Sequence, residues 1–88
     1  MKTIKLDITH IQTVKALHIY LAYMLDCPAY YGMNLDALHD VLTENGDALR
    51  VVLSGKAASG EMQDYLPRLV QVFEDSAEEN TALVFERA

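Results

Sequence analysis

The strongest constraint on the fold is the alternation, along the chain, of strand-like runs with helical stripes. Apolar side chains occupy every second position from Ile4 to Ile8, a period that predicts a strand from about Lys2 to Ile8. Short apolar runs at residues 49–53 and 81–85 predict two further strands. Helical stripes fill the intervals, and helical crossovers favour parallel pairing with right-handed connections. The sequence therefore predicts an α/β fold, a three-stranded parallel sheet packed with three to four helices.

The first and last helices are predicted from apolar residues that recur every three or four positions. The first follows Thr13, a suitable N-cap, and ends near Leu25, because Pro28 disfavours helical geometry just before it. The last is expected to begin close to Pro67, since proline fits only the first helical turn, and to end before Asn80. Both are expected to pack on the sheet.

The interval from 54 to 65 is harder to interpret. Gly55 and Gly60 interrupt it, and it predicts a loop followed by a short helix.

A second helix is predicted after Asn34, a good N-cap, with Asp36 in its first turn. Its buried stripe consists of leucines at positions 35, 38 and 42, and the turn residues at 44–47 end it. Because this helix is short and its outer face is polar, it is the helix expected to present a surface.

Length and composition limit the remaining possibilities. The 88 residues suit a single domain, residues 1–88, and 51% hydrophobic content suffices for one core. The net charge of −6 argues against direct nucleic-acid binding and favours either simple solubility or attraction to a basic partner. Cys27 is the only cysteine, so no intrachain disulfide can form. With no signal peptide or membrane span apparent, we expect a cytoplasmic protein that does not bind membranes.

The second helix carries three acids on its outer face. Asp36, Asp40 and Glu44 are spaced four residues apart, so they lie along one side of the helix. A solvated face is the ordinary explanation, but such faces usually mix charge signs, and no Lys or Arg occurs between Lys15 and Arg50. The pattern favours a recognition surface for a cation-rich partner.

The loop before this helix contains adjacent tyrosines. Tyrosine offers a large contact area with a polar tip at a small entropic cost, although one of Tyr30 and Tyr31 is expected to belong to the core. Gly32 suits either a positive φ or a close approach of the backbone.

Catalytic and metal chemistry find little support. The three histidines and Cys27 lack metal-ligand spacing, and no phosphate-binding glycine loop is present, so we expect no metal and no cofactor. Hydrolysis by Asp36 and Asp40 is an alternative, but it requires a pocket that an exposed helix face does not provide. We therefore expect that the protein is not an enzyme.

Two segments resemble the barstar family of intracellular inhibitors of barnase-type ribonucleases. The matching residues are Tyr30-Tyr31-Gly32, Asn34-Leu35-Asp36-Ala37-Leu38, Asp40 and Leu42-Thr43, followed by Leu69-Val70-Gln71-Val72-Phe73 and Asp75. The predicted order of elements is similar to the barstar fold over essentially the whole length. The resemblance implies an inhibitor that blocks a basic ribonuclease by presenting carboxylates where RNA phosphates bind.

The resemblance also implies roles for single residues. Asp40 matches the aspartate that enters the phosphate site, and Asp36 matches a second acid that pairs with enzyme cations. Tyr30 matches a tyrosine that packs on the enzyme's catalytic histidine, and Thr43 matches a polar contact. Asp75 replaces a family glutamate and is one methylene shorter.

The chain departs from the family pattern at His39, where a tryptophan precedes the key aspartate, and at Glu44-Asn45, where the family has Gly-Trp. Losing aromatic anchors can lower affinity or change the partner. An interaction module for a different basic toxin or protein is therefore the alternative function. We expect a free monomer whose partner is a basic extracellular-type ribonuclease. The predicted partner-binding residues are Tyr30, Gly32, Asn34, Asp36, His39, Asp40, Thr43, Glu44 and Asp75.

Overall fold

A computed structural model describes all residues from 1 to 88. The elements, in chain order, are β1 (Lys2–Asp7), α1 (Val14–Met24), α2 (Leu35–Glu44), β2 (Leu49–Ser54), α3 (Gly60–Glu79) and β3 (Leu83–Arg87). The α/β fold and the parallel sheet with three helices are confirmed.

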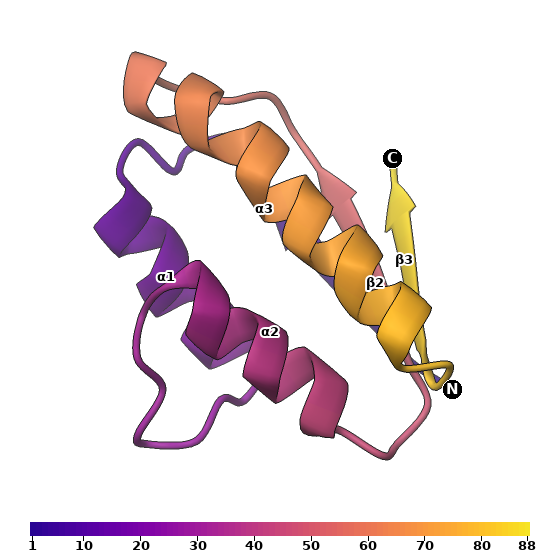
Figure 1. The fold of residues 1–88 in the computed structure, drawn as a ribbon. Coiled ribbons are helices and arrows are strands. Elements are labelled where there is room, and N and C mark those ends of the chain that lie inside the picture. Colours follow the sequence, from indigo (N-terminus) through magenta and orange to yellow (C-terminus); the bar gives the residue numbers. More distant parts are fainter.

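The three strands form one parallel sheet in the order β1-β2-β3. Val51 of β2 lies at its centre, opposite Ile4 on one side and Phe85 on the other. Both crossovers step in the same direction along the sheet, so connections of one hand place their helices on one face. Figure 1 shows α3 in front of the strands, α2 and α3 lying side by side, and α1 to the left of β2 and β3.

The two faces of the sheet therefore differ in exposure. On the helix-covered face, Leu6 and Val51 are fully buried. On the open face, β1 exposes Lys5 and Asp7, and alternation along the strand explains the difference.

The core lies between the sheet and the three helices. Phe73 of α3 is fully buried and stacks on Phe85 of β3, with ring centroids 4.8 Å apart. The buried apolar residues are Ile4, Leu6, Ile8, Leu17, Leu21, Tyr31, Leu38, Leu42, Leu49, Val51, Leu53, Met62, Leu69, Phe73 and Leu83. No helix of the protein is both long and apolar enough to cross a membrane.

The predicted caps of the first two helices are confirmed. The Thr13 hydroxyl accepts a hydrogen bond from the Ala16 amide at 3.0 Å, and the side-chain oxygen Oδ1 of Asn34 accepts one from the Ala37 amide at 2.8 Å. Each bond satisfies an amide that has no partner inside its helix.

The start of α3 was predicted wrongly. The helix begins at Gly60, not near Pro67, and absorbs the short helix expected before it. Ser59 caps it by accepting from the Met62 amide at 3.1 Å, and the fully buried Met62 anchors the first turn to the core. Pro67 is exposed inside the helix, where water can reach the carbonyl that its missing N–H leaves free.

The third strand begins at Leu83 and ends at Arg87, two residues later at each end than predicted. Asn80 accounts for the shift. Its side-chain amide donates to the carbonyls of Leu42 at 2.9 Å and Asn45 at 2.7 Å, and its oxygen accepts from the Ala82 amide at 3.0 Å. These bonds hold residues 80–82 as a turn against the end of α2.

Candidate functional site

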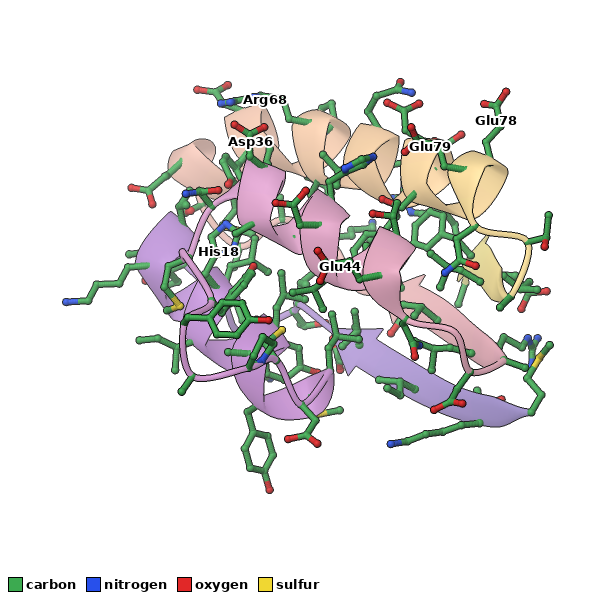
Figure 2. All side chains as sticks on the ribbon, turned by 60° about the horizontal axis from the view of Figure 1, so that its bottom comes forward. His18, Asp36, Glu44, Arg68, Glu78 and Glu79 are labelled. Atoms are coloured by element: carbon green, nitrogen blue, oxygen red, sulfur yellow. The ribbon has the colours of Figure 1, made fainter.

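The acids of α2 lie on its exposed side. Leu38 and Leu42 are buried against the core, which turns Asp36, Asp40 and Glu44 toward solvent. The Asp40 side chain is 74% exposed. Figure 2 shows Asp36 and Glu44 on α2, whereas His18 lies inside the molecule. The one-sided stripe of carboxylates that the sequence predicts is therefore present.

The two tyrosines of the preceding loop have opposite environments. Tyr30 is 82% exposed, whereas Tyr31 is only 8% exposed and belongs to the core. The Tyr31 hydroxyl lies 2.7 Å from Nδ1 of His18. The prediction that one of the pair is a core residue is confirmed, and the ring of the other is exposed to solvent.

The loop backbone is unusual at two residues that are not glycine. Asp26 and Met33 have φ of 51° and 57°, in the left-handed region. Gly32 does not share this geometry, so a positive φ is not its function. A Cβ at Gly32 would lie 3.3 Å from Ala37 Cβ and from Asn34 Nδ2, tighter than ordinary van der Waals contact. The alternative explanation, a close approach of the backbone to the start of α2, is the one the structure supports.

Loop and helix together line an open hollow of about 340 Å³. It brings together six of the nine predicted binding residues, namely Tyr30, Gly32, Asn34, Asp36, Asp40 and Glu44. An exposed aromatic ring and three carboxylates thus surround one concave surface, which suits a protruding cationic side chain of a partner protein.

His39 is a predicted binding residue whose ring already has a partner within the protein. It is half-buried between α2 and α3, where Nε2 contacts the carboxylate of Glu79, and Nδ1 lies 3.9 Å from that of Asp40. The imidazole therefore connects the acids of α2 with those at the end of α3.

Asp75 lies outside the hollow of the Tyr-Gly loop. It lines a second open hollow of about 520 Å³ with His39, Glu78 and Glu79. Thr43 is half-buried, and its hydroxyl donates to the His39 carbonyl of its own helix at 2.8 Å. The Thr43 hydroxyl can therefore serve a partner chiefly as an acceptor.

Glu78 and Glu79 were not among the candidate residues predicted from the sequence. Both are exposed at the end of α3, where Figure 2 labels them. The available signal was the acid-rich run at 74–79, which contains four acids and no basic residue. Its relation to α2 depends on the packing of two helices that are distant in sequence.

Burial shifts the pKa values of four groups that are not among the predicted binding residues. Burial lowers the pKa of His18 and raises the pKa values of Tyr31 and Tyr65, so the imidazole and both phenols are neutral near pH 7. Burial, reinforced by the Asp26 charge, also raises the pKa of the Cys27 thiol. A thiol in this state is a poor nucleophile. No group of three or more His, Cys, Asp and Glu side chains is arranged to hold a metal ion.

Comparison with known proteins assigns the chain to a family. The family described as "Barstar (barnase inhibitor)" matches residues 1–86. The chain belongs to the barstar family. A Bacillus subtilis (strain 168) protein named "Putative ribonuclease inhibitor YrdF" is 36% identical over 81 residues, which cover 90% of this chain and 89% of that protein. The barstar-like resemblance seen in the sequence is thus confirmed, and the match to the family covers nearly the whole chain.

Proposed function

We propose that this barstar-family protein inhibits a barnase-type basic ribonuclease by inserting α2 carboxylates where RNA phosphates would bind. The observation that carries the proposal is the joint exposure of Asp36, Asp40 and Glu44 beside the exposed Tyr30 ring. The family's description and the name of the Bacillus subtilis protein support a ribonuclease as the partner.

The distribution of charge supports this surface. Arg68 is the only Lys or Arg on α2 or α3, and its guanidinium lies over the Tyr65 ring, 5.3 Å from the centroid. Arg50, the next basic residue after Lys15, is ion-paired with Glu86 on the open face of the sheet. The binding surface therefore keeps its negative charge, which attracts a basic enzyme over several ångströms and speeds their encounter.

Asp40 is the central anchor in this proposal. It is exposed in the middle of α2 and lines the first hollow, and its carboxylate is 3.9 Å from Nδ1 of His39, which lines the second. A carboxylate that meets Arg or Lys in a desolvated interface forms charge-assisted hydrogen bonds, which are stronger than neutral ones. Asp36 and Glu44 flank it on the same face, and Tyr30 adds apolar contact area.

The surface is held in shape before binding. Asn34 caps the start of α2, and the buried Leu38 and Leu42 fix the helix on the core. A surface that is already ordered loses less conformational entropy on association. Thr43 and Asp75 lie at the margins of the candidate site, and His39 replaces the tryptophan of the family. We therefore propose that these three residues determine which of the related enzymes the protein binds. In this proposal the protein is a cytoplasmic monomer and not an enzyme.

The test is RNA cleavage by several barnase-type ribonucleases with and without the protein. We expect at least one of them to be inhibited stoichiometrically. Undiminished cleavage of RNA at micromolar excess, for every enzyme tried, would overturn the proposal. Capture of bound proteins from the native host then distinguishes this function from the alternative, an interaction module for a different basic protein. The proposal predicts that the main protein captured is a small basic nuclease.

A further inference from the structure

A fully buried histidine joins three parts of the fold. His18 lies on α1, its side chain is inaccessible to solvent, and both ring nitrogens have partners. Nδ1 lies 2.7 Å from the Tyr31 hydroxyl of the loop, and Nε2 lies 2.8 Å from the Tyr65 hydroxyl of α3. We call these three side chains the Tyr31–His18–Tyr65 cluster. None of the three is among the predicted partner-binding residues, although Tyr31 lines part of the hollow beside α2.

The hydrogen-bonding capacities of the cluster match. A neutral imidazole has one donor and one acceptor nitrogen, and a phenol hydroxyl can take either part. Either tautomer therefore satisfies both nitrogens, with one tyrosine donating and the other accepting. Because an unpaired buried polar group is costly, loss of the Tyr65 hydroxyl leaves one nitrogen of His18 unsatisfied and frees the imidazole to shift away from Tyr31.

Tyr31 is the buried anchor of a loop that is otherwise irregular. Its amide donates to the Pro28 carbonyl at 2.9 Å, closing a turn, and the loop includes two residues of positive φ at 26 and 33. Its neighbours in sequence, Tyr30 and Gly32, are exposed and line the hollow beside α2. Any displacement of Tyr31 moves both of them.

We propose that His18 and Tyr65 are positioning residues for partner binding, which act through Tyr31 to hold Tyr30 and Gly32 in place beside the acids of α2. The proposal rests on the proposed function for the identity of the partner. Its claim about the loop concerns the free protein.

The surroundings of His18 favour its neutral form. Two ionisable groups lie near the cluster. Cys27 of the loop is close enough to Tyr31 to raise its pKa, and Arg68 of α3 lies over the Tyr65 ring. The strands present only apolar side chains to the core, and no ion pair of the protein includes His18. A proton added to His18 has no carboxylate partner, so acid should loosen the loop.

The experiment compares amide-exchange protection in the free wild-type protein, Tyr65→Phe and the control Tyr23→Phe, which removes an exposed hydroxyl from α1. We expect Tyr65→Phe to lower protection of the Tyr31 amide by several-fold to about tenfold, the range for losing one buried hydrogen bond. Amides in the middle of α3 should change less, and Tyr23→Phe should change neither.

A pH profile separates positioning from simple packing. In the wild type, protection of the Tyr31 amide should fall as the pH is lowered from 7.5 to 5.5, after correction for intrinsic exchange. In His18→Gln, which keeps a donor and an acceptor but cannot gain a proton, the profile should be flat. Equal loss of protection throughout the molecule in Tyr65→Phe, or an unchanged pH profile in His18→Gln, would overturn the proposal.

Inhibition of a ribonuclease tests whether the position of the loop matters for partner binding. Where the wild type inhibits an enzyme, Tyr65→Phe should weaken the inhibition several-fold and Tyr23→Phe should not. A loosened loop with unaltered inhibition contradicts a positioning role in binding. Where no enzyme is inhibited, the proposed function fails, and the exchange measurements still decide whether the cluster positions the loop.

Discussion

At the scale of single residues, the candidate site separates into side chains that are exposed to solvent and side chains that hold them in place. Tyr30 and Tyr31 are adjacent in sequence, yet one is exposed and the other is buried against His18. The exposed acids follow from helical spacing and the buried leucines, so the sequence predicts them. Which tyrosine enters the core, and that His18 meets Tyr65, depends on the packing of separate elements and has no local signal.

Asp40 carries the sharpest prediction at this scale. Asp40→Asn should weaken binding to the ribonuclease by about 2–5 kcal/mol, because enzyme cations buried at the interface lose their charged partner. Titration calorimetry or inhibition constants measure the change. Asp47→Asn is the matched control, since it alters the same charge at an exposed turn outside both hollows of the candidate site. Equal effects of the two substitutions would show that only net charge matters.

At the scale of elements, the structure differs most from the sequence prediction in α3. Thr13 and Asn34 are N-caps at the positions predicted, because their signals are local. Pro67 misled the prediction because a proline inside a helix is normally costly, and the Ser59 cap with the buried Met62 outweighs that preference. The late start of β3 depends on bonds from Asn80 to the end of α2, which are non-local.

Pro67→Ala tests this explanation of α3. The substitution restores an N–H to the helix interior, so we expect the free energy of unfolding to rise by about 2–2.5 kcal/mol. This is the helix cost of proline, about 3 kcal/mol, less the roughly 0.4–1 kcal/mol by which proline lowers the entropy of the unfolded chain. Urea unfolding measures it. Glu74→Ala, at another exposed position of α3, serves as the control and should change stability less. A destabilised Pro67→Ala protein would mean that the ring makes contacts that α3 requires.

At the scale of the whole molecule, charge and burial are separated between faces. The helix face gathers the acids of α2 and α3, and the ion pair of Arg50 with Glu86 lies on the open face of the sheet. Association with a basic enzyme should therefore slow as salt rises, since screening shortens the Debye length from about 30 Å at 0.01 M to about 10 Å at 0.1 M. Stopped-flow measurement should show a falling association rate and a nearly constant dissociation rate. A salt-independent association rate is incompatible with steering by this face.

The buried His18 makes overall stability depend on pH. Burial lowers its pKa below the ordinary 6.5, so the unfolded chain takes up a proton at a higher pH than the folded protein does. The free energy of unfolding should be unaffected by His18 above pH 6.5 and should fall as the pH drops below it. Urea unfolding between pH 7.5 and 5.5 measures this slope. His18→Gln should lack the His18 part of the slope, and identical slopes in both proteins would contradict the assignment.

Competition for the ribonuclease active site tests whether the α2 carboxylates occupy the phosphate sites. If carboxylates of α2 occupy the phosphate sites, a non-cleavable oligonucleotide bound to the enzyme must leave before the protein binds. The apparent Kd of the protein should then rise in proportion to oligonucleotide concentration once the enzyme is saturated. A ternary complex of enzyme, oligonucleotide and protein, formed at an unchanged Kd, would contradict phosphate mimicry by α2.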